Sequence, residues 1–132
     1  MSNLNIKERQ VGDVTILDIN GNLRIGEESI ALRKTIRRLS EEGKKQILLN
    51  LAHIAYIDSS GLGELVAGYV SLRRSGGQIK LLHLTQKVSE VMMITKLLTV
   101  FDAYEDESEA LESFKTAELE APAPVLNRGV AL

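Results

Sequence analysis

The 132-residue chain contains no cysteine, no tryptophan, only two prolines and only 4% aromatic residues. The absence of cysteine excludes a disulfide scaffold, a thiol nucleophile and a cysteine-ligated zinc site. The few aromatic side chains leave little for stacking on bases, and a net charge of -2 gives no basic surface for phosphates. We therefore expect a protein that does not bind nucleic acid.

The chain also lacks any apolar run near the ~20 residues that a membrane helix needs, and its first 13 residues are interrupted by charges. We therefore expect a cytoplasmic protein without membrane contact. What the chain does contain, 44% hydrophobic and 26% charged residues, is typical of one globular domain. A chain of this length can bury roughly two thirds of its unfolded surface, which is enough for a core without disulfides.

The spacing of apolar residues predicts alternating strands and helices. The expected elements are strands at Leu4–Arg9 and Val14–Ile19, a helix at Gly26–Ser40, a strand at Gln46–Leu51, a helix at Ser60–Arg74, a strand at Gln78–Leu84, a helix at Thr85–Leu97, a strand at Val100–Tyr104 and a helix at Glu107–Glu118. A turn is expected at Asn20-Gly21-Asn22, and residues 52–57 are expected to lead over the end of the sheet as a connecting segment.

This order of elements predicts a small α/β domain with a mixed, mostly parallel sheet of about five strands and about four helices. No internal repeat and no second domain is visible. The stretch Ala121-Pro122-Ala123-Pro124 and the residues after it have no periodicity. We expect one domain over residues 1–118 and a flexible tail over residues 119–132.

The sequence gives little support for catalysis. Of the two histidines, His53 is expected in a loop and His83 inside a strand, and neither accompanies a nucleophile elbow. No phosphate-binding loop, dinucleotide fingerprint or metal-ligand spacing is present. A phosphoacceptor role for Asp58 is disfavoured, because the early strand ends without an acidic pair and Lys80 lies near the start of its strand. We expect no enzyme, no metal and no cofactor.

The segment Asp58-Ser59-Ser60-Gly61 follows a buried strand and begins a helix, where Asp and Ser cap free N–H groups. Helical spacing predicts an outer side with small or short side chains: Gly61, Glu64, Ala67, Gly68 and Ser71. A phosphate at the first turn would stabilise its own helix by ~0.3 to 1 kcal/mol. The same phosphate would cost a docked acidic or apolar partner several kcal/mol. This helix is therefore a candidate on/off binding surface.

These residues resemble the STAS family, specifically the bacterial anti-sigma factor antagonists. The resemblance is carried by Ile47-Leu48-Leu49-Asn50-Leu51, by Tyr56-Ile57-Asp58-Ser59-Ser60-Gly61-Leu62-Gly63 and by Gly76-Gly77 before a strand. It implies a mixed sheet with helices mainly on one side. It also implies that the unphosphorylated protein binds an anti-sigma factor that is itself a serine kinase, and that a metal-dependent serine phosphatase reverses the modification.

The resemblance places the phosphorylated serine at Ser59, with Ser60 as the alternative and with Asp58, Gly61 and Arg24 supporting the site. The expected partner-binding residues of the following helix are Leu62, Gly63, Glu64, Ala67, Gly68 and Ser71. We expect a monomer or a weak dimer.

The chain departs from the family pattern at two positions. Where many members carry G-E-L-D, it has Gly21-Asn22-Leu23-Arg24, and where the family often has aspartate in the third strand it has Asn50. The cation at Arg24 suggests the hypothesis that it holds a phosphate already present on the serine.

Two other functions remain open from the sequence. The first is a STAS module that is never phosphorylated and serves as a scaffold in a sensory assembly, which would form a large particle. The second is a nucleotide-binding domain that uses a pocket near Asp58 and Arg24, which would bind a nucleoside triphosphate without any kinase.

Overall fold

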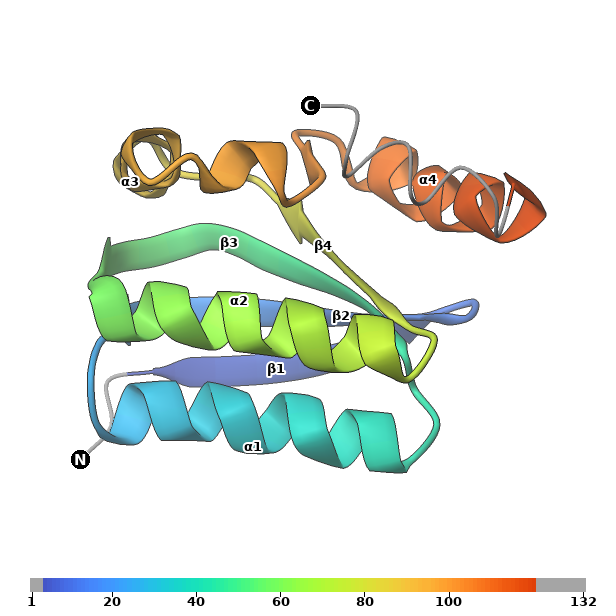
Figure 1. Cartoon of the computed structure of the whole chain (residues 1–132), viewed down its shortest axis with the longest axis horizontal. Helices are drawn as coiled ribbons and strands as arrows, with labels where there is room; N and C mark the ends of the chain where they lie inside the picture. The colour runs from blue at the N-terminus through green and yellow to red at the C-terminus, as the bar shows by residue number, and fades with distance from the viewer. Residues whose placement is uncertain (1–3, 121–132) are drawn as a thin grey trace.

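The computed structural model describes residues 4–120, with side chains over residues 4–115. Its elements are β1 (Asn5–Val11), β2 (Val14–Leu23), α1 (Glu27–Glu41), β3 (Gln46–Ile57), α2 (Ser59–Arg74), β4 (Gln78–Leu82), α3 (Gln86–Ile94), the 3-10 turn η1 (Leu97–Thr99), β5 (Ala103–Tyr104) and α4 (Glu107–Glu120). Figure 1 shows their arrangement. Most of the expected tail, residues 121–132, lies outside the described residues.

The strands form one sheet in the order β1-β2-β3-β4-β5. The hairpin β1–β2 is antiparallel, and the other neighbouring pairs are parallel. A parallel pair needs a crossover connection, and here α1, α2 and α3 provide the crossovers. The prediction of an α/β fold with a mixed, mostly parallel sheet of five strands and four helices is confirmed for residues 4–120.

The two faces of the sheet are covered unequally. Helices α1 and α2 run side by side across one face (Figure 1), and their apolar stripes meet a large core that also includes Val88 and Met92 of α3. Helix α4 covers the other face with a smaller cluster that contains Ile16, Leu48 and Phe114. The helices therefore lie mainly on one side, and α2 belongs to the side with the larger core.

The strands β2 and β3 are longer than the sequence indicates. The predicted turn at 20–22 is wrong, because β2 continues to Leu23 through an irregular register at Gly21, where φ is +116°. The prediction that residues 52–57 leave the sheet is also wrong, because they pair with the end of β2 as part of β3. His53 accordingly lies in an exposed strand position and not in a loop.

The region after β4 is less regular than expected. His83 was predicted inside a strand, but β4 ends at Leu82 and His83 adopts a positive φ of 58°. Its N–H donates to the carbonyl of Tyr104 at 2.8 Å, which fixes this bend. The predicted strand over 100–104 is only the two-residue β5, because Val100 and Phe101 donate their N–H groups to the carbonyl of Leu97 and not to a neighbouring strand.

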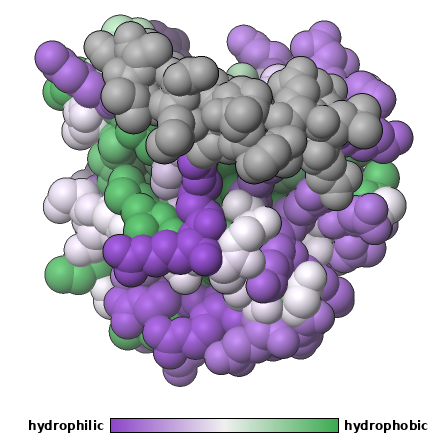
Figure 2. Space-filling model, turned by 45° about the vertical axis from the view of Figure 1, so that its right-hand side comes forward, coloured by the Kyte–Doolittle hydropathy of each residue, from purple (hydrophilic) through white to green (hydrophobic). Residues whose placement is uncertain are grey.

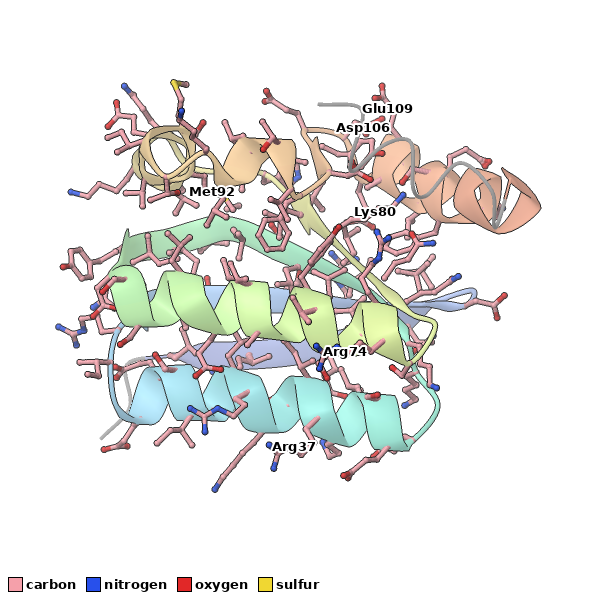
Figure 3. All side chains as sticks on the ribbon, viewed as in Figure 1. Arg37, Arg74, Lys80, Met92, Asp106 and Glu109 are labelled. Atoms are coloured by element: carbon pink, nitrogen blue, oxygen red, sulfur yellow. The ribbon has the colours of Figure 1, made fainter. Side chains whose placement is uncertain are left out.

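Two polar residues on the face beneath α4 have defined partners. Lys80 is buried between the sheet and α4 (Figure 3), where its Nζ donates to Ser113 Oγ at 2.9 Å and lies 4.9 Å from the centre of the Phe114 ring. Asn50 Nδ2 donates to Asp18 Oδ1 at 2.8 Å. An aspartate at position 50 would place two carboxylates in contact, so the amide suits this neighbour.

Candidate functional site

The candidate site lies at the edge of the sheet where β2 and β3 end together. The two strands are parallel, and Leu23 is the register partner of Ile57. The loop between β2 and α1 therefore adjoins the first turn of α2. This pairing brings Arg24 and Asp58 to the same edge, as the sequence predicted.

Asp58 connects these two segments through both of its carboxylate oxygens. Oδ1 accepts from the N–H of Gly61 at 2.9 Å as the N-cap of α2, and Oδ2 accepts from the N–H of Ile25 at 3.0 Å. These N–H groups, Gly61 first, lower the pKa of Asp58 below its ordinary value. The ionised carboxylate of Asp58 therefore holds the first turn of α2 against the loop before α1.

Gly61 faces the sheet and not the solvent. A Cβ at this position would lie 2.3 Å from the carbonyl oxygen of Leu23 and 2.8 Å from its Cγ. The prediction that Gly61 is on the outer side of α2 is therefore wrong. Its missing side chain lets the backbones of α2 and β2 come close.

Gly68 is also turned away from the open surface. A Cβ there would lie 3.0 Å from Ile36 Cδ1 and 3.3 Å from Ile79 Cδ1, so it packs where α1 and α2 meet. The prediction that Gly68 is on the outer side of α2 is therefore also wrong, because Gly68, like Gly61, faces another part of the protein. The spacing within α2 does not show which neighbouring element covers a given side of the helix.

Ser59 is exposed and Ser60 is partly exposed at the first turn of α2. Neither side-chain hydroxyl makes a hydrogen bond to another described residue. Both oxygens of Asp58 are already engaged by backbone N–H groups, so its carboxylate holds the turn in place. The first turn of α2 therefore presents the Ser59 hydroxyl to solvent.

Arg24 is partly exposed in the loop beside this turn. Its Nε lies 4.0 Å from Oε1 of Glu28, whose side chain is only 8% exposed. The contact leaves the rest of the guanidinium toward solvent, since 42% of the Arg24 side chain is accessible. Arg24 therefore supplies a partly neutralised positive charge at the same edge as Ser59.

The predicted partner-binding residues divide into exposed and covered ones. Gly63, Ala67 and Ser71 are exposed, whereas Leu62 is 7% exposed. The carboxylate of Glu64 is held by Arg33, with Oε2 at 2.7 Å from Nη2. The open side of α2 is therefore narrower than the sequence suggests.

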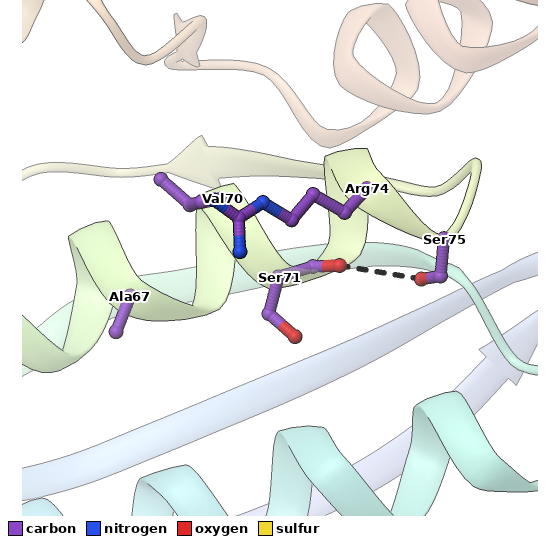
Figure 4. A pocket seen from close by; sticks show the side chains of 5 residues that line it. All are labelled: Ala67, Val70, Ser71, Arg74 and Ser75. Atoms are coloured by element: carbon purple, nitrogen blue, oxygen red, sulfur yellow. Dashed lines mark hydrogen bonds between the residues drawn. The ribbon is translucent and has the colours of Figure 1, made fainter.

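This open side extends farther toward the end of α2 than the predicted residues. A shallow depression there is lined by Ala67, Val70, Ser71, Arg74 and Ser75 (Figure 4). Val70 and Arg74 were missed by the sequence reasoning. Their spacing of three and seven residues from Ala67 is the signal that could have found them, because it keeps all three residues on one side of a helix.

The described residues offer neither a metal site nor a membrane-spanning helix. No group of three or more His, Asp or Glu side chains within the described residues could hold a metal ion. None of the helices between residues 4 and 120 has both the length and the apolar character to span a membrane.

Comparison with known proteins identifies the family. Residues 5–110 match the family model of the STAS domain. The chain belongs to the STAS-domain family. The anti-sigma-B factor antagonist of Bacillus subtilis is 27% identical to it over 100 residues, which cover 76% of this chain and 90% of the relative.

Solved structures of two bacterial proteins share the fold described above. A crystal structure of a provisionally assigned anti-sigma factor antagonist from Thermotoga maritima is 32% identical, with a TM-score of 0.76 over 82% of this chain and 92% of that one. The Bacillus cell fate determinant SpoIIAA in its phosphorylated form has a TM-score of 0.67 at 20% identity, over 83% of this chain and 99% of that one. The identity to SpoIIAA is low, so that likeness concerns the fold alone.

Proposed function

We propose that this STAS protein is an anti-sigma factor antagonist whose binding is controlled by phosphorylation of Ser59. In the unphosphorylated state, the open side of α2 binds an anti-sigma factor of the serine kinase type. The kinase then modifies Ser59, and a metal-dependent serine phosphatase removes the phosphate. The main support is the exposed Ser59 hydroxyl on a turn that Asp58 holds in place.

The physical basis of the switch is the different effect of one phosphate on two surfaces. At the start of α2 the phosphate lies near free N–H groups and the positive end of the helix dipole, so the fold tolerates it. Against a docked partner, about -1.5 to -2 charges produce like-charge contact and desolvation. A single modification can therefore empty the binding surface without unfolding the protein.

The relatives support this proposal. The Bacillus subtilis relative is named an anti-sigma-B factor antagonist, and the fold is compatible with a phosphorylated form in SpoIIAA. We further propose that the switch acts in the cytoplasm within one domain, residues 1–118, followed by a flexible tail over residues 119–132. The protein acts as a monomer or weak dimer and has no catalytic activity of its own.

The experiment that tests the modification is intact mass spectrometry after incubation with ATP, magnesium and each serine-kinase anti-sigma factor encoded by the same organism. We expect one kinase to add a single increment of about 80 Da. Ser59→Ala should abolish the increment, and Ser60→Ala is the matched control that should retain it. Loss of the increment in Ser60→Ala alone would move the site to Ser60, and no increment with any kinase would refute the switch.

The binding half of the proposal is tested with the same anti-sigma factor. We expect Ser59→Asp to weaken binding by at least about tenfold, because it places a carboxylate on the docking surface. Ser59→Ala should bind like the wild type, since it adds no charge and no bulk. Equal affinity of Ser59→Asp and Ser59→Ala would show that a negative charge at this position does not control the complex.

A further inference from the structure

Two arginines on the helical layer have no partner among the described residues: Arg37 on α1 and Arg74 on α2. The neighbouring arginines on α1 are used within the fold, because Arg33 pairs with Glu64, and Arg38 donates to two glutamates. Figure 3 shows Arg37 and Arg74 on the near side of the two helices. Their charges are therefore available to another molecule.

Arg37 belongs to the second half of α1, and Arg74 to the second half of α2. Arg37 is one turn beyond Arg33 on α1, and residues four apart share a helix face. Since Arg33 contacts Glu64, and Ile36 lies against Gly68, the part of α1 that carries Arg37 runs beside the second half of α2. The surface over this end of α1 and α2 is mostly hydrophilic (Figure 2).

Arg74 borders the shallow depression in the second half of α2 (Figure 4). The other lining residues are small or short, and Ser75 Oγ donates to the carbonyl of Ser71 at 3.3 Å. Val70 is 40% exposed and supplies an apolar contact. The depression therefore combines short side chains, a small apolar area and a guanidinium group.

The depression is continuous with the proposed phosphorylation site. The exposed residues Ser59, Gly63, Ala67, Val70 and Arg74 are separated by four, four, three and four positions, which is the spacing of one side of a helix. Because a helix rises ~1.5 Å per residue, Ser59 and Arg74 are about 22 Å apart along this side. One docked protein can cover both ends.

We propose that the depression at Arg74, together with Arg37 on the adjacent helix α1, binds an acidic segment of the anti-sigma factor that docks over Ser59. This inference rests on the proposed function and adds the chemistry of the partner. Guanidinium groups bind carboxylates in a two-pronged geometry, and arginines without internal partners lose no existing ion pair on binding. A phosphate on Ser59 would repel an acidic partner. The two ends of α2 therefore both act on an acidic partner, because the arginines attract it and the phosphate repels it.

The first test measures the association rate with the anti-sigma factor that binds the wild-type protein. In the variant Arg37→Glu/Arg74→Glu, we expect the association rate at about 50 mM salt to fall by at least about tenfold. The reduction should shrink at about 300 mM salt, where screening is stronger. The control Lys7→Glu/Lys115→Glu makes the same change in net charge away from α1 and α2 and should alter the rate less than about twofold.

Two outcomes would overturn the inference while the proposed function stands. In one, the double arginine variant associates like the wild type although Ser59→Asp still weakens binding. In the other, the control slows association as much as the arginine variant, which would indicate a diffuse charge effect. Both outcomes are read against circular dichroism spectra that show folded variants.

The second test does not need the anti-sigma factor. The 15N-labelled full chain is titrated with a decaglutamate peptide, and we expect amide shift changes to concentrate around Ala67–Ser75 and residue 37. In Arg37→Glu/Arg74→Glu these changes should disappear, and in the lysine control they should persist. Shift changes elsewhere, or unchanged shifts in the arginine variant, would refute the acidic docking site even if no anti-sigma factor binds the protein.

Discussion

The two sides of α2 differ in what they tolerate. The inner side carries Gly61 and Leu65, which lie directly against the sheet, and any added atom at Gly61 meets the backbone of Leu23. The outer side carries Ser59 and Gly63, which face open space. The inner side of α2 therefore contributes to the stability of the fold, and the outer side is available for binding and modification. Substitutions on the inner side should lower stability, whereas substitutions on the outer side should change binding.

The largest expected effect is on the inner side. Gly61→Ala places a Cβ 2.3 Å from a carbonyl oxygen, which a rotamer change cannot relieve, so α2 has to move away from β2. We expect a loss of about 3 kcal/mol in the free energy of unfolding. In a thermal melt followed by circular dichroism, this corresponds to a decrease of roughly 10 °C in Tm. A melting temperature within two degrees of the wild type would contradict the close contact.

On the outer side, Ser59→Asp should have the opposite profile. Its carboxylate lies near the N-terminal end of the helix dipole, so we expect Tm to stay within a few degrees of the wild type. The tenfold loss of affinity for the anti-sigma factor should then occur in a fully folded protein. Thermal melts and binding titrations of Ser59→Asp and Gly61→Ala, measured in parallel, check whether the effects on stability and on binding are separate. A large fall in Tm for Ser59→Asp would contradict this expectation.

Asp58 lies between the two sides, and its contribution should depend on pH. Its pKa in the folded protein is lowered, chiefly by the N–H of Gly61. The stabilisation is therefore present above the unfolded pKa, roughly 3.9, and is lost as the pH falls through the lower folded value. Asp58→Asn keeps one capping oxygen but loses the acceptor for the N–H of Ile25, so we expect a cost of about 1 kcal/mol at pH 7.

Urea titrations of the wild type and Asp58→Asn between about pH 2.5 and pH 7 measure this dependence. The difference in unfolding free energy between the two proteins should be largest at neutral pH and should decrease as the pH falls through the lowered pKa of Asp58. Asp18 and Glu107 also have lowered pKa values, through Arg9, but they are unchanged in the variant and cancel in the difference. If the difference in unfolding free energy is constant with pH, the charge of Asp58 does not contribute to holding α2 against the loop before α1.

A smaller effect is expected from Arg24 in the phosphorylated protein. If its guanidinium holds the phosphate on Ser59, Arg24→Gln should speed dephosphorylation by about threefold, which is the scale of one exposed ion pair. The pKa of the phosphate, followed by 31P NMR, should rise in the variant because a nearby cation is removed. An unchanged dephosphorylation rate and an unchanged phosphate pKa would contradict this role, and Arg24 would then interact with Glu28 and not with the phosphate.

Much of this arrangement could be predicted from local sequence. The apolar run at 46–51 defined a buried central strand, and Asp58 before a helical stripe defined a cap, because both signals depend on neighbouring residues. The glycines at 61 and 68 were misplaced because their packing partners, Leu23 and Ile36, come from other elements.

The ends of the strands were misjudged for the same physical reason. Strand pairing carried β2 through Gly21, which reads locally as a turn residue, and carried β3 to Ile57. The pairing also determines where the loop before α1 lies, and so it places Arg24 beside Asp58. Local periodicity contains no information about such register, whereas it does identify which residues can share one side of α2.

The smallest expected effect is at Gly63, two residues from Gly61 on the same helix. A Cβ at Gly63 meets no atom within 4 Å, and the residue lies inside the helix, where glycine is less favourable than alanine. Gly63→Ala should therefore raise the unfolding free energy by about 0.5 kcal/mol, whereas the same substitution at Gly61 lowers it. If Gly63→Ala also weakens binding of the anti-sigma factor while stabilising the fold, the added methyl group lies within the docked interface. If the variant is more stable and binds equally well, the partner does not contact Gly63. The partner would then contact the outer side of α2 at two separate places, near Ser59 and at the depression near Arg74.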